Sequence, residues 1–114
     1  MGDMSRLPVV FACRSLDDLR EFPIEIRRYA GYQIDKLQAG LAPDDWRSMW
    51  SIGPGVQEIR VAERGNRFPV LYILRFQATI YVLHCVLKNT RNVARRDVHH
   101  ARAVLHALLT APEA

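Results

Sequence analysis

The sequence lacks the short motifs by which many enzymes are recognised. It has no GxxxxGKS/T phosphate loop, no GxGxxG dinucleotide fingerprint, no HExxH zinc motif and no CxxC pair. Its two cysteines, Cys13 and Cys85, are too few for a disulfide framework, and we expect reduced thiols. Adjacent residues such as His99 and His100 point about 100° apart on a helix, which makes them a poor metal pair. We therefore expect neither a metal site nor a cofactor.

Long apolar runs are also missing. No stretch reaches the roughly 20 apolar residues that a membrane-spanning helix needs, and the N-terminus shows no signal-peptide pattern. The 114 residues suit one domain, 1–114, with a modest core. A hydrophobic fraction of 49% with 25% charged residues is ordinary for a globular chain, which excludes a disordered or fibrous protein. We expect a cytoplasmic protein with no membrane partner.

Acidic residues are scarce in the second half of the chain. Residues 56–102 hold nine Lys or Arg but only three Asp or Glu, whereas residues 1–55 are close to neutral. A positive segment of this kind favours an anionic partner, through long-range attraction and the release of counterions from phosphate. A solvated basic face that only aids solubility is the alternative, and charge alone leaves both open.

The spacing of the apolar residues predicts an α+β fold. It indicates a strand, two helices, three strands and a helix, at residues 7–13, 16–21, 23–40, 56–62, 68–76, 79–87 and 94–109. Ser15 is the expected N-cap of the first helix, and residues 41–55 are expected to be a connector. Short links between the last three strands allow only antiparallel neighbours. We expect a small, mostly antiparallel sheet with helices packed on one face, and a central strand at 68–76 that is largely covered on both faces.

Basic and aromatic residues lie on the predicted strands. Arg60, Tyr72 and His84 occur on three successive strands, and Lys88 and Arg91 follow where the last strand gives way to a loop. Taken singly, Arg60 could be a paired structural arginine and His84 a hydrogen-bonded core histidine. Taken together, they suggest a concavity that binds phosphate.

Such a group could cleave RNA without a metal. The 2′-hydroxyl of RNA can attack the adjacent phosphate, so the protein has to position the strand, stabilise the developing charge and supply a base and an acid. Arginine and lysine hold phosphate, while histidine or tyrosine moves protons or stacks on a base. The alternation of a strand predicts that His84 points to the same face as Val82 and Val86.

Several short segments carry a further signal. They are DDWRSM at 44–49, GPGVQEIRV at 53–61, VLY at 70–72, IYVLHC at 80–85, KNT at 88–90 and RRDV at 95–98. Their order and spacing, over nearly the whole chain, resemble the phage-related HigB-like branch of the RelE toxin superfamily. The resemblance implies the β-α-α-β-β-β-α fold and the toxin of a type II toxin–antitoxin system, a metal-independent mRNA endoribonuclease that acts at the ribosome. It also implies messenger RNA, the ribosome and a helix-turn-helix antitoxin as partners, with higher-order toxin–antitoxin complexes.

The resemblance also implies roles for individual residues. Arg60 matches the family's strand arginine, His84 its strand histidine and Lys88 the first lysine of its basic loop. With Tyr72, these are the candidate catalytic residues. The candidate RNA-binding and phosphate-binding residues are Arg64, Arg67, Arg91, Arg95 and Arg96.

Two departures from the family pattern favour another interpretation. Pro69 stands where an arginine is usual, with Arg67 as a substitute, and a proline should place this strand end at an edge or a bulge. The loop from Lys88 to Val93 has lost two lysines, which should weaken phosphate binding. The alternative is a weakened or inactive module that binds an antitoxin or RNA without cleaving. A third hypothesis is an interaction domain unrelated to RNA.

An antitoxin would cover apolar side chains on the toxin. The candidate contacts are Val9, Phe11, Trp46, Trp50, Leu105, Leu108 and Leu109. We expect most of them to belong to the core instead, and the two tryptophans are the least certain because they lie in the predicted connector.

Overall fold

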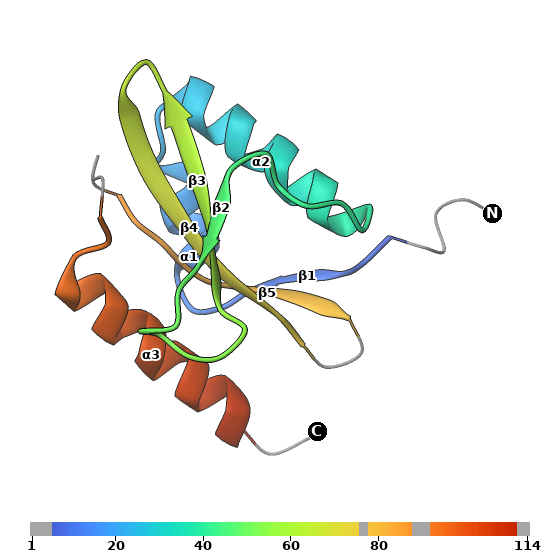
Figure 1. Ribbon diagram of the computed structural model, residues 1–114, viewed down its shortest axis with the longest axis vertical. Coiled ribbons are helices and arrows are strands. Elements are labelled where there is room, and N and C mark those ends of the chain that lie inside the picture. Colours follow the sequence, from blue (N-terminus) through green and yellow to red (C-terminus); the bar gives the residue numbers. More distant parts are fainter. Residues whose placement is uncertain (1–5, 76–77, 88–91, 112–114) are drawn as a thin grey trace.

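Eight helices and strands make up the part of the chain that the computed structural model describes, residues 6–75, 78–87 and 92–111 (Figure 1). In chain order they are β1 (Val9–Phe11), α1 (Ser15–Arg20), α2 (Ile24–Gln38), β2 (Trp46–Ser48), β3 (Gln57–Glu63), β4 (Asn66–Arg75), β5 (Thr79–Cys85) and α3 (Arg95–Thr110). The predicted α+β class is confirmed.

The strands form one sheet in the order β1-β5-β4-β3-β2. Only β1 runs parallel to its neighbour, so the sheet is mostly antiparallel, as expected. Arg64 and Gly65 join β3 to β4 with φ values of 51° and 83°. Two residues with positive φ form the type I′ turn, whose twist matches that of the strands it joins.

Helices cover both faces of the sheet, and the prediction that they pack on one face is wrong. Helices α1 and α2 contribute to one cluster of buried side chains that includes Val70 and Tyr72 of β4. Helix α3 contributes to a second cluster that includes Leu71 and Ile73 of the same strand. Figure 1 shows α2 and α3 on opposite sides of the sheet. Because β4 is apolar on both faces over residues 68–73, a sheet covered on one face would expose its other half. The prediction that this strand is covered on both faces is confirmed.

Two local predictions also differ from the structure. The predicted connector contains strand β2, in which Trp46 pairs with Ile59 of β3. Ser15 does not cap α1, because Arg14 is the N-cap residue. The buried hydroxyl of Ser15 instead donates to the carbonyl oxygen of Val82 at 3.2 Å and ties α1 to β5.

Pro69 lies inside the sheet and not at its edge. Strand β4 is central, and Pro69 pairs with Arg60 of β3. The backbone N–H of Arg60 donates to the carbonyl of Asp45 at 2.8 Å, on the side away from β4. The Arg60–Pro69 pair therefore needs no hydrogen bond from the proline nitrogen. On its other side the carbonyl of Pro69 accepts from the N–H of Val86 at 2.9 Å, just beyond the end of β5.

Cys13 is exposed and Cys85 is buried, and both are free thiols. Burial raises the pKa of the Cys85 thiol to about 12. No helix within the described ranges is both long enough and apolar enough to cross a membrane.

Candidate functional site

A row of residues in register crosses the sheet on the face that α3 covers. Arg47 of β2 pairs with Glu58 of β3, Glu58 with Leu71 of β4, and Leu71 with His84 of β5. Leu71 packs against α3, so it marks the face to which this row belongs. Charged or ionisable side chains therefore lie on both sides of a buried leucine.

Arg47 and Glu58 form the first part of this row. Nε of Arg47 lies 2.6 Å from Oε1 of Glu58, and the glutamate side chain is only 3% exposed. A buried carboxylate needs a partner because it has lost its hydration. Arg47 supplies that partner from the outer strand β2 and so fixes β2 beside β3.

Arg60 lies two residues beyond Glu58 on the same face of β3. Its side chain is 27% exposed, and its Nε lies 3.9 Å from Oδ1 of Asp45. This distance makes the contact an ion pair and not a hydrogen bond. A partly exposed guanidinium with an ion pair at this distance is suited to receive an anion.

His84 joins β5 to the start of α3. Its Nε2 lies 2.8 Å from Oδ1 of Asp97, in the first turn of the helix. Its ring lies edge-on to the ring of His100, with the ring centres 4.7 Å apart and the planes at 60°. His100 is exposed, whereas the side chain of His84 is 13% exposed. The two imidazoles and the carboxylate form a polar contact between α3 and the sheet.

A β-bulge brings His84 to this face. Leu71 pairs with His84 and Tyr72 with Val82, so Leu83 is an extra residue on β5. A bulge of this kind interrupts the alternation of the strand. The prediction that His84 and Val82 share a face is therefore wrong: Val82 packs with α1 and α2, while His84 contacts α3.

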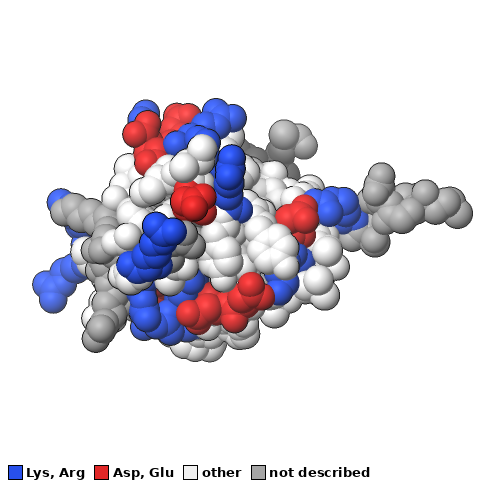
Figure 2. Space-filling model, turned by 90° about the horizontal axis from the view of Figure 1, so that it is seen from above, with Lys and Arg blue, Asp and Glu red and all other residues white. Residues whose placement is uncertain are grey.

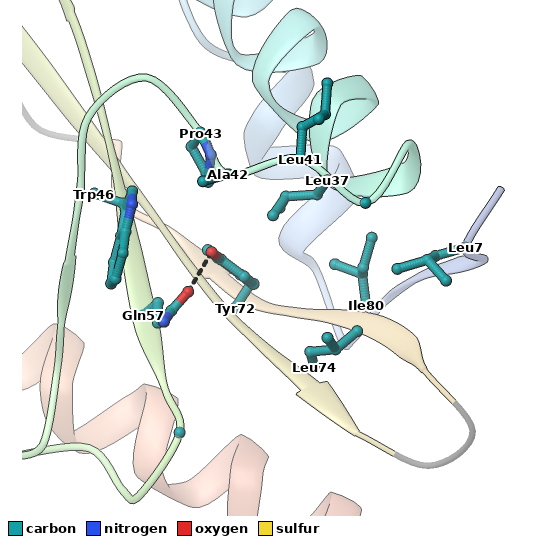
Figure 3. A pocket seen from close by; sticks show the side chains of 12 residues that line it. Leu7, Leu37, Leu41, Ala42, Pro43, Trp46, Gln57, Tyr72, Leu74 and Ile80 are labelled. Carbon is teal, nitrogen blue, oxygen red and sulfur yellow. Dashed lines mark hydrogen bonds between the residues drawn. The ribbon is translucent and has the colours of Figure 1, made fainter. Parts of the chain in front are cut away.

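Tyr72 lies on the opposite face of the sheet, in the cluster with α1 and α2. Its hydroxyl donates to Oε1 of Gln57, and burial raises its pKa to about 12. Figure 3 shows this pair inside a largely apolar cavity of about 320 Å³, to which Trp46, Leu41 and others contribute. The structure thus does not bring Tyr72 together with Arg60 and His84 as the sequence suggested.

The other predicted cations that the structure describes lie at two places, the turn between β3 and β4 and the start of α3. Arg64 is exposed at the turn between β3 and β4, and Arg67 is half-buried on β4 near that turn. Arg95 and Arg96 are exposed at the start of α3. Seen from above in Figure 2, the left-hand edge, where Figure 1 places the start of α3, carries basic side chains without acidic ones. The predictions for Lys88 and Arg91 lie outside the described residues.

A family model describes most of this chain. The model for the phage-derived protein Gp49-like (DUF891) matches residues 17–106. The chain belongs to the Gp49-like family. This family is part of the RelE/HigB-like toxin superfamily, so the resemblance to that superfamily is confirmed. A comparison with curated proteins finds no match.

The region matched by the Gp49-like model contains two site residues to which the sequence analysis gives no role in the site. Asp97 enters it as an acid and as part of the RRDV segment, and His100 as one half of a poor metal pair. Their signal is the spacing Asp97-x-x-His100, which places both side chains on one face of a helix one turn apart. Within the described ranges, no group of three or more His, Cys, Asp or Glu residues could hold a metal ion.

The candidate antitoxin contacts of this Gp49-like chain divide between core and surface. Leu105 is buried in the α3 cluster, and Val9, Phe11 and Leu108 pack partly against the two cores. Trp50 is 72% exposed, and Trp46 and Leu109 are also exposed. The expectation that most of these residues are core holds for the first group but not for the tryptophans.

Proposed function

We propose that this chain is the toxin of a type II toxin–antitoxin module, of the HigB-like branch, and that it cleaves messenger RNA at the ribosome without a metal. One observation, added to the family match, supports this function best. The strand arginine and strand histidine that the resemblance singled out, Arg60 and His84, share the α3 face of the sheet. From strand spacing and rise, their backbones are roughly 12 Å apart, close enough for both side chains to serve one RNA segment.

The chemistry follows from these side chains. Arg60 binds the scissile phosphate and stabilises the charge that develops on its oxygens. The imidazole cluster at His84 supplies proton transfer. Arg64, Arg67, Arg95 and Arg96 hold neighbouring phosphates and so position the strand, with Lys88 and Arg91 of the basic loop in the same role. Tyr72 takes no part, because it is buried on the other face.

A helix-turn-helix antitoxin is the proposed protein partner, in a cytoplasmic complex that can assemble further. The apolar cavity and its rim support this partner. Trp46, Leu41 and Leu74 are all more than 40% exposed beside a cavity lined mostly by apolar side chains. Exposed apolar side chains gathered around a cavity are typical of a protein-binding surface.

Binding without cleavage is the second candidate, and Pro69 favours it. This fully buried proline is the register partner of Arg60, so no cation reaches the phosphate from that position. In this case the same face would hold RNA but would lack part of the charge stabilisation that cleavage requires.

Controlled expression of the chain alone in a bacterium tests the toxin proposal. We expect rapid growth arrest that co-expression of the neighbouring antitoxin relieves. Arg60→Ala and Lys88→Ala should abolish the arrest at equal protein levels, whereas Arg28→Ala, an exposed cation of α2, should leave it unchanged. Normal growth with abundant folded protein would contradict a toxin that cleaves messenger RNA. Full toxicity of both the Arg60 and Lys88 variants would contradict the site.

A further inference from the structure

The imidazole of His84 is already engaged within the protein. Its Nε2 lies 2.8 Å from Oδ1 of Asp97, so this nitrogen donates to the carboxylate. The two side chains are 13% and 16% exposed. Nδ1 is the other nitrogen that could accept a proton, and the small exposed fraction of the His84 side chain gives an RNA little access to it. His84 is therefore better suited to position another side chain than to contact the RNA directly.

His100 is the residue that this pair holds. It lies one helical turn after Asp97, and its ring packs edge-on against the ring of His84 at 4.7 Å. An exposed imidazole on a helix would otherwise sample several rotamers. The fixed ring of His84 restricts that choice, and His100 is otherwise exposed to solvent.

We propose that His100 is the proton-transfer residue of this site, and that His84 and Asp97 are positioning residues behind it. The inference rests on the proposed RNA cleavage and deepens it by naming the group that meets the RNA. His100 accepts the proton of the 2′-hydroxyl while O2′ bonds to phosphorus. The bond from phosphorus to O5′ breaks, and the departing oxygen takes a proton from water. The products are a 2′,3′-cyclic phosphate and a 5′-hydroxyl.

The charged and ionisable groups around His100 come from α3 and from the sheet. Helix α3 contributes Asp97 together with the exposed Arg95 and Arg96, and β5 contributes the ring of His84. The sheet face that α3 covers also carries Arg60 and the Arg47–Glu58 ion pair. The β4 residue in register with His84 is the neutral Leu71.

Single-turnover cleavage of messenger RNA on purified ribosomes tests this assignment. His100→Gln should slow cleavage by about 100-fold or more, because general acid–base catalysis contributes about 10²–10⁴-fold. His99→Gln is the matched control, since His99 is an adjacent exposed histidine that points elsewhere, and its rate should stay within about 2-fold of wild type. Thermal unfolding of all variants checks that the fold is intact.

The positioning residues should behave differently. His84→Gln can still donate to Asp97, and we expect a smaller loss of cleavage rate, about 10-fold. Asp97→Asn should likewise slow cleavage by about 10-fold. Added imidazole should partly restore His100→Ala and not His84→Ala.

Two results would overturn the inference and can be told apart from failure of the proposed function. If wild type cleaves and His100→Gln matches His99→Gln, only the assignment of His100 fails. If added imidazole restores cleavage by His84→Ala and not by His100→Ala, His84 is the group that meets the RNA. If wild type binds programmed ribosomes and leaves the messenger intact, the proposed cleavage fails and the inference fails with it.

Discussion

Replacing Arg47 by alanine leaves the carboxylate of Glu58 buried without its partner. The glutamate side chain is 3% exposed, and its Oε1 lies 2.6 Å from Nε of Arg47. Breaking a buried ion pair by removing one partner costs about 3–5 kcal/mol. Because Arg47 is itself 37% exposed, water will enter where it is removed, so we expect a cost of about 2–3 kcal/mol. For a domain of this size that loss lowers the melting temperature by about 10 °C.

Thermal and urea unfolding of wild type, Arg47→Ala, Glu58→Gln and the double variant separate the cost of the unpaired charge from the cost of lost packing. Glu58→Gln removes the negative charge and keeps hydrogen-bonding atoms, so the double variant Arg47→Ala/Glu58→Gln should recover at least half of the lost stability. The reasoning is refuted if Arg47→Ala melts within about 2 °C of wild type. It is also refuted if the double variant is no more stable than Arg47→Ala, because the loss would then come from packing.

Three further predictions concern the scaffold. Gly65→Ala should destabilise the protein by about 1 kcal/mol in urea, because alanine is strained at its φ of 83°, and an unchanged midpoint would argue against the type I′ turn. Leu105→Ala should cost about 3 kcal/mol by leaving a cavity under α3, and a loss below about 1 kcal/mol would mean that α3 is not anchored there. Stability should fall as the pH rises above 9. In the unfolded chain the Cys85 thiol and the Tyr72 phenol have pKa values of 9.0 and 10.0, whereas burial raises both to about 12 in the folded protein, so the unfolded state loses its protons first. The slope reaches about 1.4 kcal/mol per pH unit for each group, and urea unfolding between pH 8 and 11 that shows no decline would contradict it.

The sequence was a sound guide to the elements that carry strong local patterns. The spacing of apolar residues predicted a helix over 23–40, and α2 runs from Ile24 to Gln38, with Gly40 two residues beyond its end at a φ of 81°. The apolar runs gave β3, β4 and β5 to within two residues at most boundaries. These features depend on periodicity and turn chemistry, which are local properties of the chain.

Features that depend on neighbours in space were missed. Strand β2 has three residues, which is too short for a periodic signal, and it exists because β3 offers Trp46 and Arg47 a partner. The bulge at Leu83 cannot be read from alternation, and it alone turns His84 toward α3. Asp97 and His100 become site residues only once α3 is docked on the sheet.

Mapping the 5′ ends of a messenger on purified ribosomes tests the central claim most directly. Wild type should create new 5′ ends within the translated region, Arg28→Ala should create the same ends, and Arg60→Ala should create none while keeping its melting temperature. Wild-type protein that binds the programmed ribosomes and leaves every messenger intact would contradict the account and would favour a module that binds RNA without cutting it.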